Sequence, residues 1–231
     1  FDVNLDPEDE VIVTLGSKEG LANLAQAITS PGDIILSPNP SYPIHPYGFI
    51  IAGASLRHLP AIDEGIFNPD LYLERLERSI IESVPAPVAI IVSFPSNPTA
   101  QVVSLEFYKE IVKIALKYNV YILSDLAYAE IYYDNSPPPS ILQIPKAKEV
   151  AVEFTSMSKT YAMAGWRIGF AVGNTRLINA LARIKSYLDY GAFTPVQVAA
   201  ATALNGPQEC VREIRNTYQK RRDVLINSLA R

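Results

Sequence analysis

The sequence predicts an α/β fold in which helices cover both faces of a mostly parallel β-sheet, giving three layers, α/β/α. Apolar runs rich in Val and Ile recur along the chain, and each has the length and branching of a strand buried on both faces. Amphipathic helical patterns lie between several runs, an alternation typical of a parallel sheet. The predicted strands are EVIVTL, DIILS, VAIIVSF, NVYILSD, EVAVEFT and RIGFAVG, at 10–15, 33–37, 88–94, 119–125, 149–155 and 167–173.

Three helices are predicted between these strands, at 17–29, 68–83 and 104–119, from apolar residues at helical spacing. Asn68 and Pro69 open the second of them as a cap and a first helical residue. From Thr194 onward the chain reads as almost wholly helical, with a break at 205–207.

Composition excludes several classes of protein. Of the 231 residues, 48% are hydrophobic and 19% charged, which is typical of a folded globular chain. The net charge of -4 gives no indication of a nucleic-acid partner, and we expect no membrane-spanning segment because no apolar run is long enough. The single cysteine, Cys210, argues against internal disulfides, and His45 and His58 are too scattered to suggest a metal site. We therefore expect a cytoplasmic protein without a metal.

The two ends indicate a piece of a longer protein. The chain begins without Met and almost directly enters a strand, and it stops on a helical pattern without a stop signal. We expect residues 1–205 to form one large domain and residues 206–231 to be a helix that leads toward a further domain.

Polar residues follow the ends of four predicted strands. Because ligands bind outside the carboxyl ends of parallel strands, these residues should meet at one edge of the sheet. A helix N-terminus at 16–18, the amide of Asn97, the carboxylate of Asp125 and the amine of Lys159 would gather there. Such an edge is the candidate site.

Taken singly, each candidate has an ordinary structural interpretation. A tight turn, a helix cap, a packed ring, a solvated charge or a surface ion pair would explain them one by one. Their convergence on one edge is what favours a functional reading. The residues weighed in this way are Ser17, Lys18, Tyr42, Asn97, Asp125, Tyr128, Lys159 and Arg167.

Two chemistries compete for Lys159. The Ser156-x-x-Lys159 spacing matches the serine–lysine pair of penicillin-binding enzymes, but the asparagine of their second motif is absent and no Lys-Thr-Gly follows. The alternative is a Schiff base between the lysine amine and an aldehyde cofactor. That chemistry needs an acid for a pyridine nitrogen, a phenol or amide for a ring oxygen, a stacking aromatic and a phosphate site, all of which the sequence offers.

With these residues assembled, the chain resembles the pyridoxal-phosphate aminotransferases of class I and II, which have fold type I. SMSKTYAMAGWRIG at 156–169 fits every position of the family's lysine-attachment pattern, which is long and specific. The shorter stretches GSKEGL, PNPSYP, FPSNPT and SDLAYAEI follow the family's order, so the likeness spans nearly the whole chain.

The resemblance implies a role for each site residue. Lys159 would form the Schiff base with pyridoxal 5'-phosphate and shuttle a proton, Asp125 would pair with the pyridinium nitrogen, and Tyr128 would assist catalysis. Residues 1–205 would then be the cofactor-binding large domain. The implied cofactor-binding set is Ser17, Lys18, Tyr42, Asn97, Asp125, Tyr128, Ser156, Lys159 and Arg167, with Tyr42 stacked on the ring and Ser17, Lys18, Ser156 and Arg167 on the phosphate.

Within the family the chain looks most like bacterial alanine (glutamate–pyruvate) aminotransferases. LL-diaminopimelate, aspartate and aromatic aminotransferases, or a β-lyase with the same cofactor, are the alternatives, and a cofactor-binding regulatory module is a more distant one. Ala100 departs from the glycine that most relatives carry after Asn-Pro-Thr. The family also implies a homodimer, for which we expect the loop SYLDYGAF at 186–193 to contribute contacts. Its substrate-binding arginine lies in a small C-terminal domain outside this sequence, so we expect this piece to keep the cofactor architecture without productive substrate binding.

Overall fold

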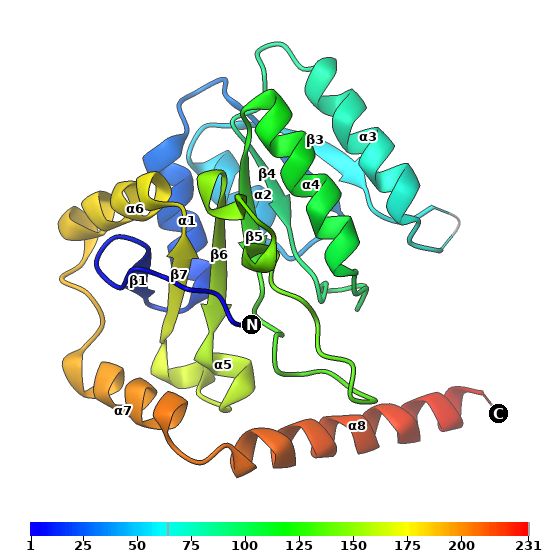
Figure 1. The fold of residues 1–231 in the computed structure, drawn as a ribbon, viewed down its shortest axis with the longest axis vertical. Helices are drawn as coiled ribbons and strands as arrows, with labels where there is room; N and C mark the ends of the chain where they lie inside the picture. The colour runs from blue at the N-terminus through cyan, green and yellow to red at the C-terminus, as the bar shows by residue number, and fades with distance from the viewer. Residues whose placement is uncertain (64, 231) are drawn as a thin grey trace.

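The computed structural model describes residues 1–63 and 65–230 and contains a seven-stranded β-sheet between two layers of helices (Figure 1). The strand order is β1-β7-β6-β5-β4-β2-β3. Six strands run in one direction and β7 runs against them, because both of its pairings, with β6 and with β1, are antiparallel. The strands are β1 (Val11–Thr14), β2 (Ile34–Asn39), β3 (Ser55–Pro60), β4 (Ala89–Val92), β5 (Tyr121–Asp125), β6 (Ala151–Ser156) and β7 (Gly169–Gly173). The predicted α/β fold with a mostly parallel sheet is confirmed.

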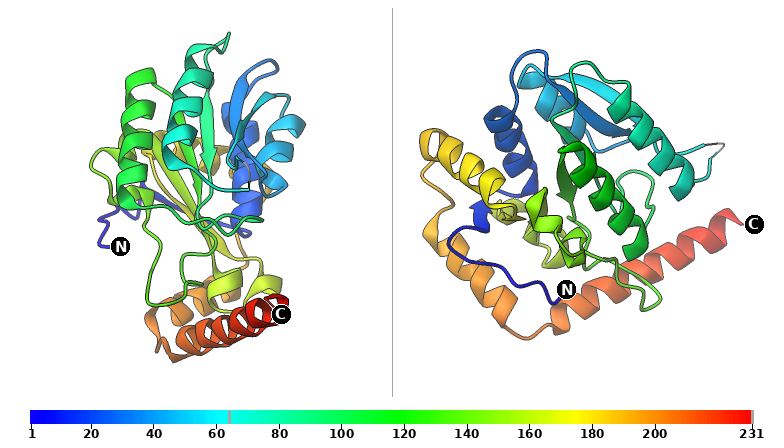
Figure 2. Two further views of the ribbon diagram at one scale, coloured as in Figure 1. Left: turned by 90° about the vertical axis from the view of Figure 1, so that its right-hand side faces the viewer. Right: turned by 45° about the horizontal axis from the view of Figure 1, so that its top comes forward.

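The helices divide between the two faces of this sheet. Helices α1, α2 and α6 pack together on one face, and α3 and α4 pack on the other (Figures 1 and 2). α7 and α8 lie beyond the edge where β6 ends, beside α5 (Figure 1). The helices are α1 (Ser17–Ile28), α2 (Ile44–Ile51), α3 (Pro69–Ile81), α4 (Leu105–Tyr118), α5 (Met157–Thr160), α6 (Thr175–Leu188), α7 (Thr194–Asn205) and α8 (Glu209–Leu229).

Local sequence signals set the ends of the predicted helices. The side chain of Asn68 accepts a hydrogen bond from the Leu71 N–H at 3.1 Å, so α3 begins at Pro69 as predicted. Ser104 caps α4 in the same way, and Asn119 ends it in the left-handed conformation with φ 54°. The break predicted at 205–207 separates α7 from α8.

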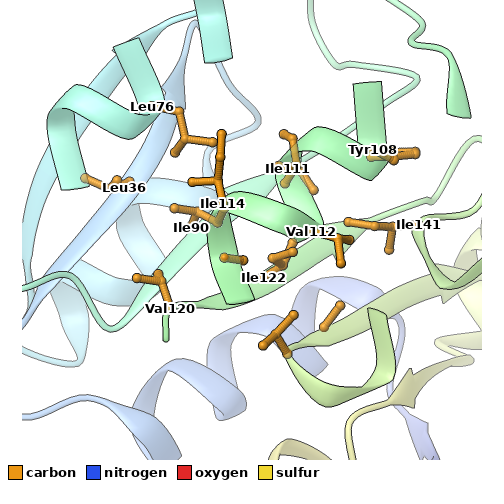
Figure 3. Close-up of a cluster of buried hydrophobic side chains, with 14 of the residues drawn as sticks. Leu36, Leu76, Ile90, Tyr108, Ile111, Val112, Ile114, Val120, Ile122 and Ile141 are labelled. Atoms are coloured by element: carbon orange, nitrogen blue, oxygen red, sulfur yellow. The ribbon is translucent and has the colours of Figure 1, made fainter. Parts of the chain in front are cut away.

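A hydrophobic core fills the space between the sheet and helices α3 and α4 (Figure 3). The side chains come from both the strands and the helices, and burial of each aliphatic side chain contributes about 1.5–3 kcal/mol. This packing fixes β4 and β5, whose carboxyl ends carry candidate site residues. Figure 3 labels Leu36, Leu76, Ile90, Tyr108, Ile111, Val112, Ile114, Val120, Ile122 and Ile141.

Four helices and strands have no counterpart among the predictions: β3, α2, α6 and the single-turn helix α5. Strand β3 is an edge strand whose residues are mostly exposed, so it lacks a buried apolar run. Helix α2 contains Pro46 within its eight residues and follows a proline-rich turn. Helix α6 has a clear apolar face, but the sequence prediction contains no helix at residues 175–188. Within the described ranges, no helix has the length and apolar character needed to cross a bilayer.

Candidate functional site

The structure brings all nine sequence-predicted site residues to the lining of one cavity of about 380 Å³. The cavity lies at the carboxyl ends of the central parallel strands, where the chain leaves β4, β5 and β6. Segments far apart in the sequence therefore meet at one edge of the sheet. The nine residues are Ser17, Lys18, Tyr42, Asn97, Asp125, Tyr128, Ser156, Lys159 and Arg167.

One wall of the cavity is the N-terminus of α1. Gly16 precedes the helix with φ 87°, and no side chain caps the first N–H groups. Arg167 lies against this turn: its guanidinium donates to the carbonyl oxygens of Ala164, at 2.9 Å, and Leu15, at 3.0 Å. A Cβ atom on Gly16 would stand 2.6 Å from Arg167 Nη2, so only glycine allows this approach. Free helix N–H groups beside a guanidinium form a site suited to a phosphate.

Another part of the lining is a buried carboxylate. Oδ2 of Asp125 lies 3.0 Å from Nε2 of His45, a residue of α2 with no solvent exposure, and the imidazole N–H donates in this contact. The other oxygen, Oδ1, accepts the Ala127 N–H at 3.3 Å in the turn that follows β5; no helix begins there, so Asp125 is not a helix cap. A carboxylate held by two donors at the end of β5 can pair with a cationic group in the cavity.

Lys159 projects from α5, the single helical turn that follows β6. Ser156 caps this turn, accepting the Ser158 N–H at 3.1 Å, and it is buried while Lys159 is exposed to the cavity. The lysine Nζ lies 5.9 Å from the centre of the Tyr128 ring. The amine is therefore accessible to a ligand and held next to an aromatic face.

Tyr128, Asn97 and Tyr42 complete the lining. Asn97 Nδ2 donates to the Tyr128 hydroxyl at 3.4 Å, which joins the segments after β4 and β5. Tyr42 packs edge-on against His45, with ring centroids 6.0 Å apart. The sequence alone left open whether Asn97 merely caps a turn and whether Tyr128 is core packing; both reach the cavity.

A second buried acid, Glu153, lies behind the site on β6. Its carboxylate accepts hydrogen bonds from Ser124 Oγ at 3.0 Å, from Ser140 Oγ and from the Ile141 N–H at 3.2 Å. Burial raises the pKa of Glu153 to about 7, the hydrogen bonds oppose this rise, and the nearby charge of Asp125 adds to it. Glu153 thus connects β5, which carries Asp125, to the segment that begins at Ser140.

A larger cavity of about 1120 Å³ adjoins the site and shares Asn97, Tyr128 and Lys159 with it. It extends to α8, where Tyr218 and Arg221 form part of the lining. The amine of Lys159 can therefore be approached from this wider space.

His45 and Glu153 are the polar groups near the site that sequence reasoning missed. His45 is the second residue of α2 and stands three residues after Tyr42, which lies just before this helix and packs against the imidazole. Glu153 interrupts an otherwise apolar strand, and a charge within a buried run is a signal of a paired acid. Each signal was present in the sequence.

The chain matches the family described as aminotransferase class I and II over residues 2–231. It is 57% identical to a putative aminotransferase, AatC, of Rhizobium meliloti (strain 1021), over all of this chain and 56% of that protein. It is 58% identical to the glutamate-pyruvate aminotransferase AlaC of Escherichia coli (strain K12), over 99% of this chain and 54% of the relative. An LL-diaminopimelate aminotransferase of Aquifex aeolicus (strain VF5) is 48% identical over 99% of the chain and 58% of its own length.

The fold is also similar to that of a solved aminotransferase structure. An aminotransferase from Staphylococcus aureus superposes with a TM-score of 0.89 at 33% identity, covering 100% of this chain and 59% of that one. The chain thus spans little more than half the length of these curated relatives and of this solved structure.

Proposed function

Because the chain belongs to the class I and II aminotransferase family, we propose that the protein carrying it is a pyridoxal 5'-phosphate-dependent aminotransferase. It would move an amino group between an amino acid and a 2-oxo acid, with alanine and glutamate as the amino acids. The likeness to the glutamate-pyruvate enzyme AlaC supports this substrate pair.

The turn before α1 fits the phosphate of this cofactor. Ser17 and Lys18 would offer backbone N–H groups, Ser156 a hydroxyl and Arg167 a guanidinium, and all four line the same cavity. The close approach of Gly16 to Arg167 supports this role, because it holds the guanidinium beside the open helix end.

The remaining residues fit the aromatic ring. Asp125, held by His45, would keep the pyridine nitrogen protonated, and Asn97 and Tyr128 would donate to the ring oxygen. Tyr42 would stack on the ring face. Nδ1 of His45 has no hydrogen-bond partner within the described residues, so the imidazole is free to hold its proton on Nε2, facing Asp125.

Lys159 would have two tasks. Its amine would bond covalently to the cofactor aldehyde, and, once released by the incoming amino acid, it would move a proton at the substrate Cα. When bound, the cofactor supplies an electron sink that makes this proton removable. The exposure of the amine toward the adjoining cavity supports both tasks, because substrate can approach from that side.

The convergence of all nine residues on one cavity is the observation that carries the proposal. The test is amino transfer between alanine and 2-oxoglutarate by the full-length protein, measured as pyruvate formed. Lys159→Ala should abolish turnover. Lys109→Ala, which removes a solvent-exposed lysine paired with Glu106 on α4, is the matched control and should leave turnover unchanged. Full activity of Lys159→Ala would refute the proposal.

LL-diaminopimelate is the second candidate substrate, because a relative named for it is 48% identical over nearly the whole chain. The cofactor residues are compatible with it and equally with aspartate, with aromatic amino acids, or with a β-lyase reaction. Comparison of kcat/KM for alanine, LL-diaminopimelate, aspartate and tyrosine separates the transaminases. Pyruvate release from cystathionine without a 2-oxo acid acceptor would identify the lyase.

The homodimer is also part of this proposal. The predicted loop at 186–193 is a loop only from Asp189 onward, because residues 186–188 form the end of α6. Three aromatic side chains of this segment are exposed: Tyr187 is 77%, Phe193 75% and Tyr190 fully accessible. Solvent-exposed aromatic side chains in one short segment support a protein contact there. The division into a large domain of residues 1–205 and a connecting helix of residues 206–231, and a cytoplasmic location, are proposed on the family resemblance and on the single cysteine.

A further inference from the structure

An ion-pair cluster around one buried lysine lies outside the residues assigned to the site. Lys185, on α6, is only 4% exposed, and its ammonium donates at 2.8 Å to Oε1 of Glu19 and at 2.8 Å to Oδ2 of Asp189. Glu19 belongs to the first turn of α1, whereas Asp189 follows the last residue of α6. One ammonium therefore joins two carboxylates from different parts of the chain.

Glu19 connects Lys185 to the turn before α1. Its second oxygen, Oε2, accepts the N–H of Leu15 at 2.8 Å, while the carbonyl of Leu15 accepts Arg167 Nη2 at 3.0 Å. Leu15 is thus held through its N–H by Glu19 and through its C=O by Arg167. A continuous path of polar contacts runs from Lys185 to the guanidinium that faces the cavity.

The cluster also governs the charge close to the turn. Burial opposes the charged form of Lys185, but the hydrogen bonds that its ammonium donates to Asp189 and Glu19 more than compensate, and the pKa of the lysine is raised. For Asp189, burial raises the pKa, but the hydrogen bonds donated by Lys185 and by the Gly191 N–H lower it by more, so the net shift is a decrease. Both shifts favour the charged forms of Lys185 and Asp189, and the ammonium of Lys185 lies against the carboxylate of Glu19 in the first turn of α1, near the open helix end.

An ordinary interpretation is a core ion pair that only stabilises the packing of α6 on α1. That interpretation does not account for the hydrogen bond that the Leu15 N–H donates to Glu19, because this contact lies at the turn before α1 and not at the interface between the two helices. We propose that Lys185 is a positioning residue for the phosphate-binding turn: it holds Glu19 so that Leu15 and Gly16 keep their places, and it cancels a negative charge that would oppose a phosphate. This inference rests on the proposed cofactor, because the turn is taken as its phosphate site.

The test compares two ligands of the full-length protein, pyridoxal 5'-phosphate and pyridoxal, which differ only in the phosphate. Dissociation constants are measured by absorbance or fluorescence titration. In Lys185→Met the constant for pyridoxal 5'-phosphate should rise at least about tenfold, while that for pyridoxal changes less than about threefold. Lys117→Met, which breaks a solvent-exposed pair with Glu77, is the matched control and should change neither constant. An unchanged ratio of the two constants in Lys185→Met would overturn the inference.

A double variant separates positioning from general damage. Glu19→Gln alone places an amide against the ammonium and should weaken phosphate-dependent binding. In Lys185→Met/Glu19→Gln the charge is gone and the glutamine oxygen can still accept from Leu15, so most of the loss in Lys185→Met should be recovered. Two independent losses that add, without recovery, would contradict the proposal.

The inference can still be tested if Lys185→Met misfolds, and its failure can be told from failure of the proposed function. If Lys185→Met does not fold, judged by circular dichroism, Glu19→Gln is compared with Asp189→Asn: the first should lose phosphate-dependent affinity and the second keep it, and equal losses overturn the inference. If the unmodified protein binds no pyridoxal 5'-phosphate, the proposed function fails. If the unmodified protein binds the cofactor and the variants have no effect, the inference about Lys185 is refuted while the proposed function stands.

Discussion

Nε2 of His45 lies 3.0 Å from Oδ2 of Asp125, and the two side chains are 0% and 7% exposed. They are 80 residues apart in sequence, and the contact connects α2 to the carboxyl end of β5. A buried carboxylate requires such a donor, because an unpaired charge there would be strongly destabilised. The contact therefore sets the orientation of the carboxyl group proposed to face the cofactor nitrogen.

Removal of this imidazole is the first prediction. In His45→Leu the carboxylate keeps only the Ala127 N–H, and a hydrogen bond to a charged group contributes about 1.5–3 kcal/mol. The dissociation constant for pyridoxal 5'-phosphate should therefore increase about tenfold or more. Absorbance titration measures it, with His58→Leu on the exposed strand β3 as the control. Equal affinity in the two variants would show that His45 does not support Asp125.

The second prediction concerns the pH dependence of stability. The pKa of Glu153 is raised by burial from 4.5 to about 7, so its protonated form is favoured in the folded chain. This contribution is complete below pH about 4.5 and is lost as pH rises through about 7. The shift corresponds to about 3 kcal/mol at about 1.4 kcal/mol for each pKa unit.

Glu153→Gln isolates this effect. The free energy of unfolding, measured by urea denaturation from pH 4.5 to 8, should show the variant gaining on the unmodified protein as pH rises. Other acids titrate in both proteins and cancel in the difference. A difference that is independent of pH would mean that Glu153 does not titrate in this range.

The third prediction uses the space beside Gly16. In Gly16→Ala the added Cβ would displace the Arg167 guanidinium, and the positive φ would add strain of about 1–2 kcal/mol. Affinity for pyridoxal 5'-phosphate should fall more than affinity for pyridoxal. Gly32→Ala is the matched control, because Gly32 has φ +94° and no atom within 4 Å of the added carbon. The control should be less stable but should keep its affinity for both ligands. If the two variants have the same affinities for pyridoxal 5'-phosphate and pyridoxal, the added Cβ does not displace Arg167.

The fourth prediction concerns Ala100. The structure gives it φ 58°, where alanine costs about 1–2 kcal/mol and the greater freedom of unfolded glycine offsets about 0.5–1 kcal/mol. Ala100→Gly should therefore stabilise the protein by up to about 1 kcal/mol, seen as a higher Tm. Ala27→Gly, within α1, should have the opposite sign. Destabilisation by both would argue against a left-handed Ala100.

The sequence predicted the sheet, most of its strands and the edge where the site lies, because strand direction alone places the carboxyl ends of parallel strands together. Lys159 and Arg167 stand in one uninterrupted motif, which made their proximity easy to predict. The contact of His45 with Asp125 could not be predicted in this way, because it depends on how α2 packs after a proline-rich turn. Edge strand β3 was missed because its residues face solvent, so no apolar pattern marks it.

The role of Lys185 shows a similar limit. Its neighbours Glu19 and Asp189 are 166 and 4 residues away, and only the packing of α6 on α1 brings the first of them to the ammonium. Amphipathic periodicity predicts which face of a helix is buried but not which charge it carries to a distant helix.

The central claim is that Lys159 bonds covalently to pyridoxal 5'-phosphate. The direct measurement is borohydride reduction of the full-length protein with the cofactor, followed by proteolysis and mass spectrometry. The account predicts one phosphopyridoxyl group on the peptide that contains Lys159, and none at this peptide in Lys159→Ala. A group attached to another lysine, or no attachment in the unmodified protein, would contradict it.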